Sequence, residues 1–275
     1  NKVCDFVVAN GRTPVFWDDM PFKFAHLWYP INFNLPEAET RRLMDFSPVD
    51  RVINRFPKAC IYMRWRYEDS KELGNQLVLD WYAKSGLKVM AATAASEAVG
   101  VHLPWPNGRL DYIKGFSEVA EQRKLLGIFA TAWDDSSPHL NTVERGYIAQ
   151  AEFGWNPHGR TTDAYKTAYA QREFGLRRKY VDFITEMEKM EPVSDSLLAL
   201  SGHRSPGFGV GGFTLLDLPD PSRPGEWSQQ YGSRISAAES CIESYQKASV
   251  NIRGALQRAL RNRYALEIYE QINNL

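Results

Sequence analysis

The chain has 275 residues, 44% of them hydrophobic, and a formal net charge of zero. This size and composition suit one large folded domain or two modest ones. The neutral charge balance gives no indication of a nucleic-acid or membrane-surface partner. No stretch of the sequence approaches the roughly 18 apolar residues that a membrane-spanning helix requires. Three scattered cysteines predict neither a disulfide framework nor a metal site, so we expect no metal and no cofactor.

Four short apolar runs in the first part of the chain predict buried strands. They cover residues 13–17, 59–65, 87–93 and 128–133. Patterns with helical spacing alternate with these runs, at residues 3–9, 71–84, 109–126 and 143–153. Alternating strands and helices are typical of a parallel sheet, and nearly continuous apolar strands indicate that both of its faces are covered.

The character of the sequence changes after about residue 160. Residues 162–190 predict a helix or a pair of helices, and residues 233–274 are strongly helical. Between them, residues 192–227 are rich in Gly, Pro and Ser and predict a long irregular segment. We therefore expect two regions, an α/β domain over residues 1–160 and a helical extension over residues 161–275.

Tryptophan and acidic residues recur together where the predicted strands end. Indole rings stack on the C–H faces of sugars, and carboxylates accept hydrogen bonds from sugar hydroxyls. Three such clusters at equivalent places in successive units therefore favour carbohydrate binding. The alternative is structural, with each Trp covering the core and each Asp capping the next helix. The clusters are Trp17, Asp18 and Asp19; Trp65, Arg66, Tyr67, Glu68 and Asp69; and Trp133, Asp134 and Asp135.

Two of these segments resemble glycoside hydrolase family 20, the β-N-acetylhexosaminidases. Residues 13–20 (TPVFWDDM) are similar to the fifth-strand segment of that family. Residues 127–137 (GIFATAWDDSS), with Glu144 on the following helix, are similar to its eighth-strand segment. The resemblance covers roughly residues 1–160. It implies an α/β fold made of the last four βα units of a (β/α)₈ TIM-type barrel, followed by the helical extension.

The family's implied reaction removes a terminal, non-reducing N-acetylglucosamine or N-acetylgalactosamine with retention. The substrate's own acetamido oxygen attacks the anomeric carbon, so the enzyme supplies no nucleophile. An Asp-Glu pair after the fourth strand orients the acetamido group and provides the acid/base. No Asp-Glu dipeptide occurs in this sequence. We therefore expect that pair to precede Asn1, that the isolated chain is inactive, and that it holds no catalytic residue.

The resemblance then carries over binding roles only. The tryptophans would form walls of the sugar pocket, and the other residues would bind sugar hydroxyls. Which acid of each Asp pair faces the sugar is left open by the sequence. The expected substrate-binding residues are Trp17, Asp18, Asp19, Trp65, Tyr67, Trp133, Asp134 and Glu144. The expected partner is a glycan containing N-acetylhexosamine.

Two other functions remain open from the sequence. The chain could be a non-catalytic carbohydrate-binding or structural protein on a degenerate TIM barrel, as the missing Asp-Glu pair suggests. It could also be a different barrel hydrolase that uses Asp18, Asp19 or Asp134 as its own acid/base pair.

Half of a barrel also exposes the edges of its sheet. We therefore expect the chain to form a homodimer, to associate with its N-terminal half, or to cover an edge with its C-terminal helices. Localisation is open, with a secreted or periplasmic location favoured over the cytoplasm, since any signal would lie upstream.

Overall fold

A computed structural model describes most of the chain. The described residues are 2–32, 35–96, 109–132, 140–176, 183, 186–187 and 222–274. The chain divides into two compact units. The first consists of residues 1–95, 108–131 and 146–160, and the second of residues 96–107, 132–145 and 161–275.

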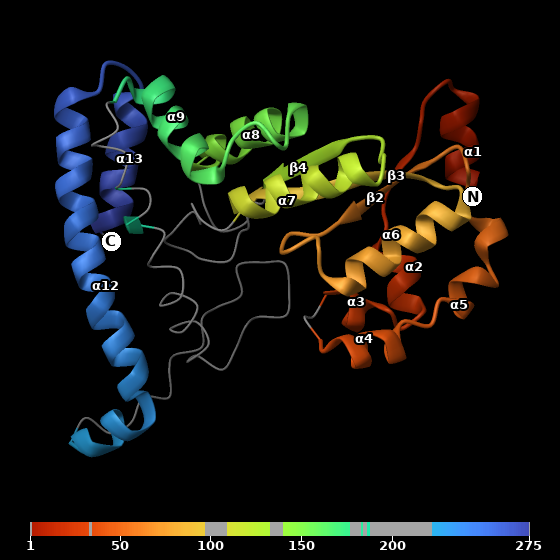
Figure 1. The fold of residues 1–275 in the computed structure, drawn as a ribbon, viewed down its shortest axis with the longest axis horizontal. Helices are drawn as coiled ribbons and strands as arrows, with labels where there is room; N and C mark the ends of the chain where they lie inside the picture. Colours follow the sequence, from red (N-terminus) through yellow and green to blue (C-terminus); the bar gives the residue numbers. More distant parts are fainter. Residues whose placement is uncertain are drawn as a thin grey trace. The chain divides into compact units, whose positions relative to one another are not determined.

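The first unit is built on a four-stranded, all-parallel sheet with the strand order β1-β2-β3-β4 (Figure 1). Its strands are β1 (Val15–Trp17), β2 (Ile61–Trp65), β3 (Lys88–Ser96) and β4 (Ile128–Ala132). Trp17 lies opposite Met63, and Met63 lies opposite Met90. All four strands lie where the sequence predicts them, which confirms the α/β class. Because strand order follows chain order, every crossover joins neighbouring strands.

Helices pack on one face of this sheet. They are α6 (Leu73–Ser85) and α7 (Arg109–Gln122), which lie beside the strands in Figure 1. Buried residues of α6 and α7, among them Val78, Tyr82 and Phe116, share one core cluster with Tyr62 and Val89 of the strands. Strand side chains alternate between faces. Tyr62 and Arg64 of β2 therefore face the helices, while Met63 and Trp65 face the opposite side.

Two more helices of the chain fall where the sequence predicts them. Helix α1 (Lys2–Ala9) precedes β1, and its Cys4 joins the core cluster of the first unit. Helix α8 (Leu140–Trp155) follows β4 and is longer at both ends than its predicted range. Gly146 of α8 approaches β3 so closely that a Cβ there would lie 2.5 Å from the carbonyl oxygen of Ala95.

Short helices fill the connection between β1 and β2, for which the pattern predicts no element. They are α2 (Asp19–Phe24), α3 (Trp28–Asn32), α4 (Glu37–Leu43), α5 (Ser47–Asp50) and the 3₁₀ helix η1 (Ile53–Arg55). Elements of three to seven residues are too short to show a helical period, and tertiary packing stabilises them instead. Helix α3 packs closely on α6, where a Cβ on Gly74 would lie 2.3 Å from the carbonyl oxygen of Pro30.

The second unit is helical in its described part. Helix α9 (Thr162–Phe174) begins at an N-cap, where the Thr161 hydroxyl accepts a hydrogen bond from the Ala164 N–H at 3.2 Å. It ends at Gly175, which has the left-handed φ of 67°. Helices α12 (Pro224–Arg258) and α13 (Arg263–Asn274) pack against each other. No helix of the described residues is both long and apolar enough to cross a membrane.

Residues 233–274 are helical, as the sequence predicts, apart from a short break between α12 and α13. Helix α12 begins earlier, at Pro224, inside the range predicted to be irregular. Residues 192–221 of that range lie outside the described residues. The helix breaks before α13, where the Leu260 N–H donates to the Phe174 carbonyl at 3.0 Å and its side chain packs on Gly175. The break thus depends on a tertiary contact with the end of α9, which helical periodicity does not reveal.

Candidate functional site

Three aromatic side chains gather at the carboxyl end of β2, and we call them the aromatic wall. The rings of Trp28 and Trp65 lie 4.8 Å apart between centroids, and those of Trp65 and Tyr67 lie 4.9 Å apart. Trp28 and Trp65 are partly exposed, whereas Tyr67 is buried. Aromatic residues at the carboxyl end of a parallel strand lie where α/β proteins place their binding sites.

A cation lies against the outer member of the aromatic wall. The Lys23 ammonium lies 4.4 Å from the ring centroid of Trp28, within the range of a cation–π interaction. Asp19 accepts a hydrogen bond from the same ammonium at 2.7 Å, one turn earlier on α2. Asp19 and Lys23 therefore place a partly exposed carboxylate and a cation next to the aromatic rings.

Asp18, by contrast, is buried in a polar network on the helix-facing side of β2. Arg64 Nη1 donates to both oxygens of its carboxylate, at 3.1 and 3.3 Å. Arg64 Nε donates to Asn75 Oδ1 on α6 at 2.8 Å. The Tyr82 hydroxyl, also on α6, lies 3.4 Å from Asp18 Oδ2 and donates to it. Of the two adjacent acids, Asp19 is thus the one that a ligand can reach.

The environment of Asp18 changes its titration. Burial raises the pKa of Asp18 from its ordinary value of 3.8 to about 6, even though Arg64 and the Trp65 backbone N–H favour the charged form. The penalty for removing the carboxylate from water exceeds what these partners return. Asp18 is therefore a structural carboxylate whose pKa is raised by its burial.

The loop that follows the aromatic wall is fixed by ion pairs. Arg66 is buried, contacts Glu68 at 2.9 Å and pairs with Glu72 immediately before α6. Its backbone N–H also donates to the Ala92 carbonyl of β3 at 2.9 Å. Arg66 lies between Trp65 and Tyr67 in the chain. Its contacts therefore fix the backbone that carries these two aromatic residues.

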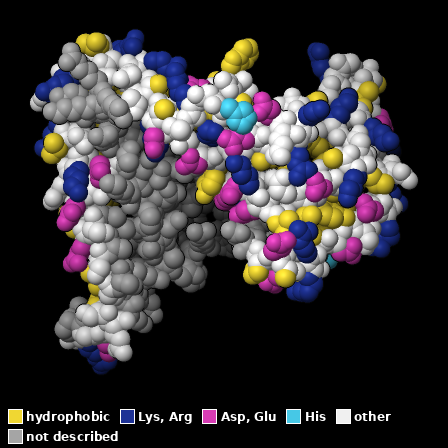
Figure 2. Space-filling view, viewed as in Figure 1, with side chains coloured by type: hydrophobic (Ala, Val, Ile, Leu, Met, Phe, Trp, Pro, Cys, Tyr) yellow, Lys and Arg dark blue, Asp and Glu magenta, His cyan; other side chains and the backbone are white. Residues whose placement is uncertain are grey.

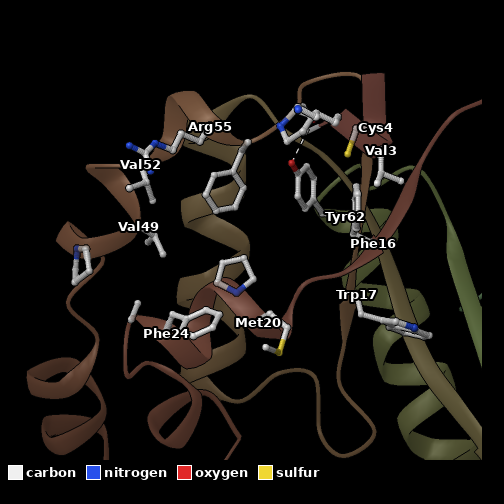
Figure 3. A pocket seen from close by; sticks show the side chains of 16 residues that line it. Val3, Cys4, Phe16, Trp17, Met20, Phe24, Val49, Val52, Arg55 and Tyr62 are labelled. Atoms are coloured by element: carbon white, nitrogen blue, oxygen red, sulfur yellow. Dashed lines mark hydrogen bonds between the residues drawn. The ribbon is translucent and has the colours of Figure 1, made fainter. Parts of the chain in front are cut away.

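Trp17 makes no ring contact with the aromatic wall, although its place opposite Met63 turns it to the same face of the sheet as Trp65. It lies at the margin of an apolar cavity of about 910 Å³, which is lined by α1, β1, α2 and the segment around α5 (Figure 3). Phe16 and Tyr62, from adjacent strands, stack side by side in the lining of this cavity, with ring centroids 6.3 Å apart. The Trp17 indole is 41% exposed and points away from the cavity interior. The structure thus brings Trp65 and Tyr67 together but does not place Trp17 in the aromatic wall.

The remaining expected site residues are Trp133, Asp134 and Glu144. Trp133 and Asp134 are outside the described residues. Glu144 is exposed on α8 and belongs to the second unit. Within the described residues, no group of three or more His, Cys, Asp or Glu side chains could hold a metal ion.

Sequence reasoning missed Trp28, Lys23 and Arg64. Trp28 and Lys23 lie in the connection after β1, where no pattern marked them. Arg64 could have been noticed, because a charged residue in the middle of an apolar strand must be paired when it is buried. Its partner, 46 residues earlier in the chain, could not be identified without the fold.

Acidic and basic side chains are interspersed on the face shown in Figure 2, as the neutral net charge leads one to expect. No protein-family model matches this chain, and a comparison with curated proteins finds no match. The class that the fold defines is therefore an α/β protein with a parallel sheet, and any narrower assignment is a proposal.

Proposed function

We propose that this chain forms part of a glycoside hydrolase that removes terminal, non-reducing N-acetylhexosamine by a substrate-assisted retaining mechanism. The aromatic wall is the observation that carries this proposal. Three aromatic rings meet at the carboxyl end of β2, and two of them are partly exposed. Such rings offer flat apolar faces to the C–H groups of a sugar. Asp19 and Lys23 beside them can exchange hydrogen bonds with its hydroxyls.

The sheet supports a barrel as the finer description of the fold. In an open doubly wound sheet the strand order reverses at a switch point, and ligands bind there. In a (β/α)₈ barrel the strands follow chain order and the site lies at their carboxyl ends. The order β1-β2-β3-β4, with β1 and β4 at the edges, fits four successive units of a barrel. We propose that these units are the last four.

The acid/base pair of the proposed reaction lies outside this chain. The sequence contains no Asp-Glu dipeptide, and Asp18 is already paired with Arg64. A substrate-assisted mechanism needs no nucleophile from the enzyme. The chain would therefore supply binding residues, and we propose Trp28, Trp65, Tyr67 and Asp19 for this role. Trp17, Trp133, Asp134 and Glu144 remain candidates through the family resemblance alone.

The test is hydrolysis of a chromogenic N-acetyl-β-glucosaminide by the whole encoded protein. Trp65→Ala removes the central ring of the wall and should lower kcat/KM about 100-fold, since buried aromatic anchors contribute ~2–4 kcal/mol. Trp155→Ala is the matched control, because this indole is 91% exposed and lies outside the aromatic wall. An absence of turnover by the wild-type protein, or equal losses in the two variants, would contradict the proposal.

A non-catalytic carbohydrate-binding protein is the second candidate. The observation that favours it is the buried ion pair of Asp18 with Arg64. Because Asp18 is buried and paired, its carboxylate is not available at the strand end for catalysis. This candidate predicts that the wild-type protein binds N-acetylglucosamine oligosaccharides, that Trp65→Ala abolishes binding, and that no hydrolysis accompanies it.

A further inference from the structure

Asp18 makes contacts with three consecutive residues of the neighbouring strand. Its backbone N–H donates to the Met63 carbonyl at 3.2 Å. Its carboxylate accepts from Arg64 Nη1 at 3.1 Å and from the backbone N–H of Trp65. A single residue at the end of β1 thus fixes the end of β2, just where the aromatic wall begins.

Arg64 also contacts Asn75, and this contact connects Asp18 to helix α6. Arg64 Nε donates to Asn75 Oδ1, and Asn75 Nδ2 donates to the Ser70 carbonyl at 2.7 Å. Ser70 lies in the loop that carries Tyr67 away from β2. Asp18, Arg64 and Asn75 are all buried, so water does not compete for these hydrogen bonds.

The network and the aromatic wall lie on opposite faces of β2. Arg64 points toward α6, and the next side chain, Trp65, points to the other face, where it meets Trp28. A change in the position of the β2 backbone is therefore transmitted directly to the Trp65 ring. Buried ion pairs contribute little net stability compared with apolar residues, but they can select one arrangement among several.

We infer that Asp18 is a positioning residue, which sets the place of Trp65 against Trp28 and thereby shapes the proposed sugar-binding surface. It acts through the backbone of β2 and does not touch the sugar. This inference rests on the proposed function only for the identity of the ligand. The position of the two indoles can be measured without any ligand.

The first readout is the exciton couplet that two closely packed indoles produce in far-ultraviolet circular dichroism. The contribution of the Trp28–Trp65 pair to this couplet is the part of the signal that disappears in the Trp65→Phe variant. Asp18→Ala, which deletes the carboxylate, should abolish that contribution at temperatures well below unfolding. Asp18→Asn, which keeps one acceptor, should reduce it. The helical signal should stay unchanged in both variants.

Asp50→Asn is the matched control, because Asp50 also accepts a hydrogen bond near a tryptophan. Its Oδ1 accepts from Trp81 Nε1 at 2.7 Å, in the core of the same unit. The control should leave the couplet unchanged. A normal couplet in folded Asp18→Ala and Asp18→Asn proteins would overturn the inference. If Asp18→Ala does not fold, Asp18→Asn decides.

The second readout is the affinity of the whole encoded protein for a thiazoline inhibitor of hexosaminidases. A displacement of the wall by ~1 Å predicts about 100-fold weaker binding by Asp18→Ala, with Asp50→Asn unaffected. Unchanged affinity in a variant that has lost the couplet would overturn the link to binding. If the wild-type protein binds no inhibitor while the couplet still depends on Asp18, the proposed function fails and the positioning role stands.

Discussion

The buried pair of Asp18 and Arg64 is the most consequential residue-level feature of the first unit. Both side chains are completely buried, and their charged atoms lie 3.1 Å apart. Placing two charges in such an environment is costly, and their attraction repays this only with good geometry and additional hydrogen bonds. Asn75, Tyr82 and the Trp65 N–H supply such bonds, but burial still outweighs them and raises the pKa of Asp18. The pair therefore makes the junction of β1 and β2 specific and sensitive to pH.

The raised pKa of Asp18 gives a prediction for stability against pH. The groups that face it are Arg64, Tyr82, the Trp65 N–H and, more weakly, Asp19. A folded pKa of about 6 against 3.8 means that the folded state binds the proton more tightly. The stabilisation is complete below the unfolded pKa and disappears as pH rises through 6. A shift of about two units corresponds to about 3 kcal/mol.

Urea unfolding of wild type and Asp18→Asn between pH 4 and pH 7.5 measures this effect. The free energy of unfolding of the wild type should fall relative to that of the variant as pH rises through about 6. A constant difference between the two proteins across this range would show that Asp18 does not titrate there.

At this scale the sequence predicts residues that follow strands and misses those in irregular connections. Trp65 is the last residue of an apolar run and Tyr67 follows two residues later, so their place at a strand end is predictable. Trp28 lies in a five-residue helix, and only the packing of α3 beside α6 brings it to Trp65. The choice between Asp18 and Asp19 depends on Arg64, which is distant in the chain.

Among the elements, the contact between α3 and α6 matters most for the site. Gly74 in the first turn of α6 touches the backbone of Pro30 and Ile31, close to Trp28. Gly74→Ala would place a methyl group 2.3 Å from the Pro30 carbonyl oxygen, so α3 must move. We expect a loss of ~1–3 kcal/mol in the free energy of unfolding and a weaker Trp28–Trp65 couplet.

Gly115→Ala provides the matched control for this substitution. It lies inside α7, and its new Cβ would meet Ser70 Oγ at 3.8 Å, an ordinary contact. Alanine should stabilise a helix interior by up to about 1 kcal/mol relative to glycine. Chemical unfolding and circular dichroism of both variants measure the difference. Equal stability of the two variants would mean that α3 can move away without cost.

The long helices were predictable because each carries a helical period, and the strands because each is an apolar run. Helices α6 and α7 and all four strands fall within a few residues of their predicted ranges. Helix α9 begins at the predicted Thr162 and ends at Phe174, inside the range 162–190 predicted for one helix or two. The short helices between β1 and β2 carry no such signal. The break between α12 and α13 follows from the contact of Leu260 with Gly175, which no local pattern encodes.

On the scale of the molecule, the first unit has an apolar side around α1, β1 and α2. Val3, Phe6 and Phe24 are each more than two-thirds exposed there. β1 is a terminal strand of the sheet, paired with β2 alone among the described strands. Large exposed apolar patches and open strand edges both favour association with another chain.

We therefore expect the 275-residue chain to self-associate when studied alone. Phe6→Lys combined with Phe24→Lys should reduce the association, because charges on the apolar side oppose burial. Tyr264→Lys, at an aromatic residue of the second unit that is 68% exposed, should leave it unchanged. Sedimentation velocity over a range of protein concentrations measures the effect. A wild-type chain that stays monomeric throughout would contradict the expectation.

The central claim is that the aromatic wall binds N-acetylhexosamine, and calorimetry with a thiazoline inhibitor tests it most directly. The whole encoded protein should bind the inhibitor with one-to-one stoichiometry. Trp65→Ala should weaken binding by about 100-fold, corresponding to ~2–4 kcal/mol for an aromatic anchor, while Trp155→Ala binds normally. Absence of binding by the wild-type protein, or undiminished binding by Trp65→Ala, would contradict the account.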